Sequence, residues 1–548
     1  MEVHSPELSS GTSPSLKRPR EDDNSPSAST SKRVKIDPEP TTGSGEAVAE
    51  PVDLEHRKKS AGEAEVAPHR DDNKGGRQRK SKAKEKRDSR RGTRNETAAE
   101  HRDNGEPKAA RLPKAKSAML IGFCGSGYQG MQMQYEAHVK TIEGTLFDAL
   151  VRIGAVSKDN ADDHAKVALH RAARTDAGVH AAGNLVSLKL ITEIPGVPDF
   201  VARVNEELPP EIRLWSVSRV QRSFDARALC DSRKYTYFFP SYMLVPPKPG
   251  CGLERTLREH GYDEPLHPFW AEAGSESTVE DDLRRKRAYR VPSEKVDELR
   301  VMAKKFEGTH NFHNLTIGRD FNDRSCHRLM KSIERKVADP QVYNNTQWIS
   351  VLFHGQSFML HQRLMMSVLI LSCHTGTSPQ LIDELYGPRK VRIPKTPALG
   401  LLLEYPIFGS YNKRIAAANE GVQQSDPAYR PPIDFEIHRE ALDRFKQEHI
   451  YSRMRSIEEQ EGMFDAWIRH IDGYAGDDFL YFNPKGIIPA AAVLKKGEQR
   501  SNPFKEKRRF DSTVATVDSS GEAAIEEREE EEDAKVVLDH RKLADMEG

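Results

Sequence analysis

The chain has 548 residues, of which 31% are charged and only 36% are hydrophobic. It is long enough for two domains but too polar to fold along its whole length, so part of it is expected to form tails. Its 84 basic and 84 acidic residues give a formal net charge of zero, so the net charge gives no information about binding partners.

Five cysteines, at positions 124, 230, 251, 326 and 373, show no CxxC spacing. This pattern excludes a disulfide-rich secreted scaffold and favours a reducing, intracellular compartment. The sequence has no apolar run of about 18 residues, and its first residues, MEVHSPELSS, lack the apolar core of a signal peptide. We therefore expect a soluble protein that contacts no membrane.

Residues 1–115 are rich in Ser, Pro, Lys, Arg, Glu and Asp and nearly free of aromatic side chains, which predicts a disordered N-terminal tail. Two basic clusters in this tail, residues 17–20 (KRPR) and 32–35 (KRVK), are spaced like a bipartite nuclear-import signal. They predict a nuclear protein that binds import receptors, and the alternative is a solvated run of charge.

The first folded domain is predicted over residues 116–230. Apolar alternation predicts strands at 119–123, 167–171, 185–190 and 214–220, and helical spacing predicts helices through Leu146, Leu150 and Ile153 and at 200–208. The resulting β-α-β-β-α-β order is that of a ferredoxin-like, split β-α-β unit.

Residues 231–412 are predicted to repeat this plan. The expected elements are strands at 234–239, 331–337 and 348–353, a helix that Ser293 caps and Gly308 ends, and a buried helix at 358–371. Residues 241–291, rich in proline and charge, are predicted to be an insertion between the first strand and the helix. The expected fold class is α+β, with two ferredoxin-like halves whose sheets join.

The C-terminal part is predicted to be a helical extension followed by a tail. Residues 413–432 form a polar linker, and apolar residues keep roughly helical spacing from Leu442 to Ile471, which closes the extension at 472. We expect its helices to pack on the core as a scaffold, with RNA contact as the alternative. Over 473–548 the pattern fades and residues 526–533 are strongly acidic, which predicts a disordered acidic tail.

One turn carries the candidate chemistry. Residues 170–190 place Asp176 between two strand-like runs, with Arg174 two residues before it and Gly178 two residues after it. Such a turn lifts one carboxylate out of a sheet edge, and Arg174 is near enough in sequence to orient that carboxylate or to contact a phosphate. From residue types alone, a polar hairpin turn is the more common interpretation.

Residues 174–181, RTDAGVHA, resemble the active-site motif of the TruA-type tRNA pseudouridine synthases, and residues 171–173 and 182–184 resemble its eukaryotic branch. Further strings follow in the family's order and cover about residues 116–412: they are 123–130, 142–144, 224–227, 233–237, 308–312, 355–359 and 397–401. The resemblance implies an enzyme with a central RNA-binding cleft that isomerises tRNA uridines to pseudouridine.

The resemblance also implies residue roles. Asp176 would be the nucleophile, by one of two routes that stay open: it adds to C6 of the base, or it assists departure of uracil at C1′. Arg174 would help extrude the uridine, and Tyr235 would stack on the base, although a core-facing tyrosine is its alternative. Gly400 and Leu401 would form a wall of the base pocket. The reaction requires neither cofactor nor metal, and a structural zinc elsewhere is left open.

One segment departs from the family pattern. Residues 361–366 have the sequence HQRLMM, whereas the eukaryotic branch has a string of the type HQIRKM where the buried helix begins. The family has a basic residue at this helix start that faces the active site, and Arg363 is the candidate for it. Arg363 and Arg171 are both assigned to substrate binding. Either local unwinding absorbs the one-residue shift, or the gene model is mistaken at this point.

The expected partner is tRNA, with small nuclear RNA and messenger RNA as alternatives, and the expected oligomeric state is a monomer. A non-catalytic RNA-binding or RNA-folding protein on the same scaffold is the rival hypothesis. A base-releasing glycosidase would ordinarily show two carboxylates, whereas only Asp176 is found. The sequence leaves open which uridines are modified.

Overall fold

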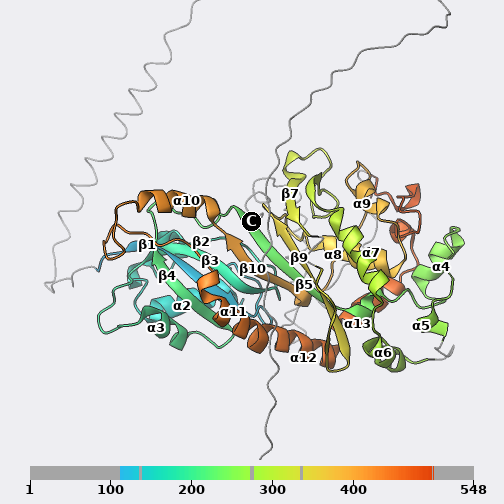
Figure 1. Cartoon of the computed structure of the whole chain (residues 1–548), viewed down its shortest axis with the longest axis horizontal. Helices are drawn as coiled ribbons and strands as arrows, with labels where there is room; N and C mark the ends of the chain where they lie inside the picture. The colour runs from blue at the N-terminus through green and yellow to red at the C-terminus, as the bar shows by residue number, and fades with distance from the viewer. Residues whose placement is uncertain are drawn as a thin grey trace, which may run out of the picture. The chain divides into compact units, whose positions relative to one another are not determined.

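The computed structural model describes residues 112–134, 139–263, 265–271, 277–333, 337–495 and 498. The two predicted import clusters and the acidic run at 526–533 lie outside these residues. Within them the chain has the predicted α+β class, since helices pack on a mixed β-sheet (Figure 1).

The N-terminal half alternates strands and helices as predicted. Its elements are β1 (Ala115–Phe123), α2 (Ile142–Arg152), β2 (His170–Arg171), β3 (His180–Leu190), α3 (Phe200–Glu207) and β4 (Ile212–Arg219). Strand β1 pairs antiparallel with β3 and β4, and β2 pairs antiparallel with β3. The helices begin where Thr141 and Asp199 accept hydrogen bonds from free backbone N–H groups. Their apolar faces bury one side of the sheet, so that Met119 packs in one core with Leu146 and Val204.

The C-terminal half repeats this order. Its sheet strands are β5 (Ser232–Pro240), β6 (Gly308–Asn311), β7 (His327–Ser332), β8 (Gln341–Tyr343), β9 (Thr346–Gly355) and β10 (Leu401–Ile407), and its covering helices are α7 (Ser293–Lys304), α8 (Leu364–His374) and α9 (Gln380–Leu385). Strand β5 lies between β10 and β9, and β7 pairs with the other edge of β9, all antiparallel. The order of adjacent strands in the C-terminal half, β10-β5-β9-β7, thus matches the order in the N-terminal half, β4-β1-β3-β2. Every residue of α8 is buried, as expected for a helix that is apolar all round.

The two half-sheets join along one seam. The first residues of β3 pair parallel with β10, through His180 opposite Leu402 and Ala181 opposite Leu403, and Leu403 also lies opposite Tyr235 of β5. The ten strands of the described residues therefore form a single sheet. Figure 1 shows β3 and β10 side by side, and their pairing brings His180, four residues after Asp176, next to the C-terminal half.

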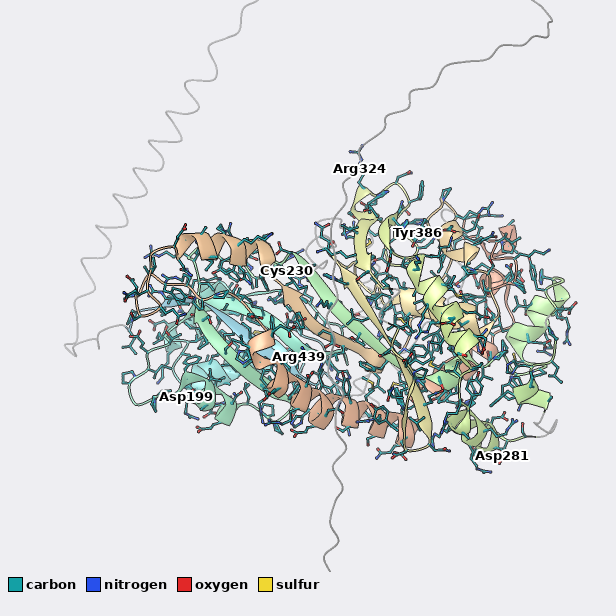
Figure 2. All side chains as sticks on the ribbon, viewed as in Figure 1. Asp199, Cys230, Asp281, Arg324, Tyr386 and Arg439 are labelled. Carbon is teal, nitrogen blue, oxygen red and sulfur yellow. The ribbon has the colours of Figure 1, made fainter. Side chains whose placement is uncertain are left out.

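The C-terminal part of the described chain is helical. Its helices are α10 (Gly409–Ala418), α11 (Arg439–Phe445), the π-helical turn Lys446–Tyr451, α12 (Ser452–Glu461) and α13 (Met463–Asp472). Phe445 packs edge-on against Trp215 of β4 with ring centroids 5.3 Å apart, and Tyr451 packs against Phe238 of β5 at 4.9 Å. Figure 2 labels Arg439 at the start of α11, and Figure 1 shows α11 and α12 running from the N-terminal strands toward β9. Phe445 and Tyr451 thus link α11 and the π-helical turn to strands of both halves, so this part of the extension packs on the core.

The predicted tail boundary at residue 473 is wrong. Residues 477–492 pack on the C-terminal half, with Phe479, Leu480, Tyr481 and Phe482 at most 1% exposed. The Tyr481 hydroxyl donates to the carbonyl oxygen of Arg392 at 2.7 Å. Four consecutive large apolar residues lack helical periodicity but can still be buried when they meet preformed helices.

Several predicted element boundaries also differ. Helix α10 occupies part of the predicted linker 413–432, and residues 241–291 contain α4 (Gly252–Glu259), α5 (Pro268–Ala271) and α6 (Val279–Ala288). The strand predicted at 331–337 is β7, which ends at Ser332, while Val337 forms an isolated bridge to Val351. The buried helix begins at Leu364 rather than at 358. Pro292 is the N-cap of α7, so Ser293 is its first helical residue and makes no capping bond.

Candidate active site

The turn that carries Asp176 is supported from behind by the loop after β1. Met131 N–H donates to the carbonyl oxygen of Thr175 at 3.1 Å, and Gly178 N–H donates to that of Tyr128 at 3.3 Å. A Cβ added to Gly125 would lie 2.0 Å from the carbonyl oxygen of Val179, a clash that only glycine avoids. The glycine-rich loop 125–130 therefore permits a close backbone contact that fixes the turn.

Two buried side chains hold the residues just before the turn. Arg233 of β5, 3% exposed, donates from Nε and Nη2 to the carbonyl oxygen of Ala172 at 2.9 and 2.6 Å. The Asn184 side chain accepts from Ala173 N–H at 3.2 Å and donates to its carbonyl oxygen at 3.0 Å. Both halves of the sheet thus fix the backbone that leads to Asp176.

His180, the first residue of β3, holds the other end of the turn. Its Nδ1 accepts from Gly125 N–H at 3.1 Å, and its Nε2 lies 3.2 Å from the carbonyl oxygen of Leu399. An imidazole that accepts at one nitrogen and donates at the other is neutral. Burial lowers the pKa of His180 to about 4, which agrees with this neutral state.

Asp176 faces a mainly apolar cavity of about 100 Å³. The cavity is lined by the turn itself (Arg174, Thr175, Asp176, Val179), by Tyr235, Phe353 and Leu401 of the sheet, and by residues 358–363, 365 and 366. An apolar enclosure of this kind strengthens electrostatic interactions within it and keeps water from a reactive intermediate.

The Asp176 carboxylate is held ionised. Its side chain is 27% exposed, and His361 Nδ1 lies 2.9 Å from Oδ2. Burial alone would raise the pKa of this carboxyl, but the nearby charges of His361, Arg363 and Lys395 outweigh burial, so the pKa lies below its ordinary value. Since an ionised carboxylate only accepts hydrogen bonds, the shared proton belongs to His361 Nδ1.

Tyr235 closes one side of the cavity. Its ring meets Phe358 edge-to-face, with centroids 4.8 Å apart and an interplanar angle of 74°. Burial raises the pKa of its phenol above the ordinary value, so the hydroxyl stays protonated at neutral pH. The ring is half-buried and forms part of the cavity wall.

The segment before α8 carries the irregular sequence noted above. His361 has a left-handed backbone, with φ of 55°, and residues 364–366 donate to carbonyl oxygens three residues earlier at 2.9 to 3.1 Å. This tight, 3₁₀-like start places Arg363 at the N-cap of α8, where it is 6% exposed and lines the cavity. Arg363 therefore reaches Asp176 electrostatically without an extra residue before it.

Four further predicted residues divide into two groups. Arg174 and Leu401 line the cavity as expected. Arg171 instead forms an ion pair with Glu143, a carboxylate that is fully buried. Gly400 is absent from the described cavity lining, and the expectation that it forms a pocket wall is wrong: a Cβ there would lie 2.3 Å from the carbonyl oxygen of Phe238, so its role is close packing on β5.

Three site residues were missed from the sequence. His361 lies within the irregular string, but nothing in that string indicated contact with Asp176. Lys395 acts on Asp176 from a loop more than 200 residues away in the chain, and Arg233 was noted only as part of a matched string. Among the described residues, no three His, Cys, Asp or Glu side chains gather as a metal-binding set, and no helix is long and apolar enough to span a membrane.

Comparison with known proteins gives consistent matches. A family model described as tRNA pseudouridine synthase matches residues 302–408. The chain is 41% identical over 415 residues to tRNA pseudouridine synthase 1 of Eremothecium gossypii, spanning 67% of this chain and 75% of the relative. It is 40% identical over 420 residues to tRNA pseudouridine synthase 1 of Saccharomyces cerevisiae, spanning 68% and 74%. It is also 34% identical over 388 residues to the tRNA pseudouridine(27/28) synthase of that yeast, spanning 65% and 99%.

Proposed function

The chain belongs to the TruA-type tRNA pseudouridine synthase family and is a tRNA pseudouridine synthase, and from this premise we propose that Asp176 is its nucleophile. The observation that carries the proposal is the ionised Asp176 carboxylate in a mainly apolar cavity, under the charges of His361, Arg363 and Lys395 and with the Tyr235 ring in the cavity wall.

The reaction breaks the N1–C1′ bond of a uridine, turns the base, and joins C5 to C1′. An ionised carboxylate serves both open routes, since it can add to C6 or stabilise C1′ while the base departs. In either route the detached uracil must stay close to the ribose, and the apolar cavity supplies that enclosure. Every atom of the product comes from the substrate, so we propose that the enzyme requires no cofactor.

Three residues assist Asp176 in this proposal. Tyr235 stacks on the target base, because its ring forms a cavity wall and base stacking is worth about 1–3 kcal/mol. Arg363 keeps the carboxylate ionised from the start of α8. Arg174 stands at the cavity edge and fills the space that the extruded uridine leaves in its stack.

We place the RNA across the seam between β3 and β10, with the two ferredoxin-like halves forming the walls of the cleft. Each half has the strand neighbours and crossover helices of that unit, and Asp176 lies where the two meet. We further propose a monomeric nuclear enzyme that acts on tRNA, imported through residues 17–35 by import receptors, with small nuclear and messenger RNA as further substrates. Pseudouridine mapping in RNA from cells with and without the protein identifies its targets.

The direct test is Asp176→Asn, which keeps the shape of the side chain but removes the nucleophile. The purified variant should bind tRNA normally and form no pseudouridine. Asp148→Asn is the matched control, since Asp148 is exposed on α2 and should leave turnover unchanged. Turnover of Asp176→Asn above a few per cent of wild type would refute the assignment.

A further inference from the structure

A second cavity, of about 250 Å³, lies beside the catalytic one. It is lined by Leu169, His170, Arg171, Ala172, Arg174 and Arg227. Arg174 lines both cavities, so the reaction site and this second space share one side chain. We name it the anion pocket because its lining carries three guanidinium groups and one imidazole and no carboxylate.

The acidic residues nearest to the anion pocket are already engaged. Glu143 is fully buried, pairs with Arg171, and accepts from Met133 N–H at 3.0 Å. Asp225 accepts from the backbone N–H groups of Arg227 and Ala228, both at 2.9 Å, and lies 3.1 Å from His170 Nδ1. Glu143 offsets the charge of Arg171 and Asp225 lies against His170, so three guanidinium groups against two carboxylates leave the pocket and its neighbours with a net positive charge.

The field at His170 agrees with this excess. Burial first lowers its pKa, and the charges of Lys116, Arg171 and Arg227 add to that effect, while only Asp225 opposes them. Although burial is the largest cause of this shift, three of the four charges that act on the imidazole are positive, as expected at a site that favours an anion.

The anion pocket is also rigid before any ligand arrives. Strand β2 fixes Arg171 opposite Val186 of β3, and Ala172 N–H donates to the carbonyl oxygen of Leu185 at 2.8 Å. The carbonyl oxygen of Ala172 accepts from Arg233, as described above. A cation set on a fixed backbone binds an anion with little cost in ordering.

We propose that the anion pocket binds a phosphodiester group of the RNA substrate that flanks the target uridine, an inference that rests on the proposed function. A nucleotide that is flipped out rotates about its backbone, so its flanking phosphates stay beside the mouth of the base pocket. Guanidinium groups match phosphate oxygens in geometry as well as charge. Arg174 then has two neighbours, the base cavity on one side and the bound phosphate on the other.

The test compares Arg227→Gln with wild type in tRNA binding, measured by fluorescence anisotropy over a series of KCl concentrations with full-length protein. Loss of one phosphate contact should weaken binding about tenfold and lower the slope of log affinity against log salt by roughly 0.7–0.9. The loss should raise KM more than it lowers kcat, because Arg227 lines the anion pocket and does not line the catalytic cavity. Arg222→Gln is the matched control, since Arg222 is exposed and lies outside the anion pocket.

A chemical substitution locates the contact. RNAs are prepared with one neutral methylphosphonate linkage on either side of the target uridine. With one of these RNAs, Arg227→Gln should no longer weaken binding, because the phosphate charge that Arg227 contacts is absent. Arg227→Lys should restore most of the salt slope, which a merely structural role would not explain. The proposal is overturned if Arg227→Gln binds like Arg222→Gln, or if its penalty persists with both substituted RNAs. Failure of Asp176→Asn to abolish turnover would refute the proposed nucleophile but leave this binding result intact.

Discussion

Glu458→Gln is expected to change how the stability of this protein depends on pH. Glu458 lies in α12, is 2% exposed, and accepts from Phe464 N–H at 2.8 Å through Oε2, while Oε1 shares a hydrogen bond with the Tyr242 hydroxyl. Burial raises the pKa of this carboxyl from 4.5 to about 7, and Asp465 adds to the effect. The hydrogen bonds from Tyr242 and Phe464 only partly oppose it.

The sign follows from proton binding. Between pH 4.5 and about 7 the folded protein binds the Glu458 proton and the unfolded chain does not, so stability falls as pH rises through this window. At about 1.4 kcal/mol for each pH unit, the loss amounts to roughly 3 kcal/mol at and above pH 7. Glutamine mimics the protonated acid, since its amide can donate to Tyr242 and accept from Phe464 N–H. The variant should therefore match wild type below pH 4.5 and exceed it by roughly 3 kcal/mol above pH 7.

Urea denaturation of both proteins from acid to neutral pH measures this difference. Other groups, such as the neutral buried His180, titrate equally in both proteins and cancel in the difference. Glu461→Gln, an exposed position on the same helix, is the control and should give a difference that does not vary with pH. A flat difference for Glu458→Gln, or one that grows toward acid pH, would refute the reasoning.

Four further outcomes are expected. Tyr235→Ala should lower kcat/KM about 10- to 100-fold because the stacking contact is lost. Tyr235→Phe keeps the ring and therefore separates stacking from any proton transfer by the hydroxyl. Full activity in the alanine variant would show that Tyr235 only packs in the core. Truncation after Asp472 should abolish cooperative thermal unfolding because each buried aromatic it removes is worth about 3–5 kcal/mol, whereas truncation after Lys495 should melt like the full chain. Deleting residues 1–40 should move a fluorescent fusion to the cytoplasm with activity unchanged in vitro, and an unchanged nuclear signal would contradict the import role. Inserting Ile after Gln362 should not raise pseudouridine formation, since Arg363 already reaches the cavity; a gain would show that the natural segment is compromised.

Local patterns predicted most of the fold. Strand alternation and helical spacing located β1, α2, α3 and β4 of the N-terminal half, because these elements bury apolar side chains at regular spacing against their sequence neighbours. The prediction failed for the start of β3, which was expected at 185 and begins at His180. Those first residues pair with β10, more than 200 residues away, and no local pattern carries a contact of that length.

The residues of the candidate site were likewise only partly predicted from the sequence. Asp176, Tyr235 and Leu401 were placed in the cavity by resemblance to a known motif, and the structure brings them together. Arg171 and Gly400 were assigned by the same resemblance, but neither lines this cavity: Arg171 pairs with the buried Glu143 and lines the second pocket, and Gly400 packs closely on β5. Resemblance to a motif therefore does not by itself show which of its residues face the reaction cavity.

The irregular segment at 361–366 shows how a missing residue is absorbed. A helix shortened by one residue would turn Arg363 away by roughly 100° if it stayed regular. Instead His361 adopts a left-handed backbone and the next turn tightens to bonds of three-residue spacing, and Arg363 lines the cavity from the N-cap of α8. The left-handed conformation costs about 1–2 kcal/mol for a residue with a Cβ, and the charge-assisted hydrogen bond from His361 to Asp176 is of similar size and offsets it. The strain therefore sits on the residue that contacts Asp176, so the same contact that stabilises this backbone also helps to keep the Asp176 carboxylate ionised and oriented.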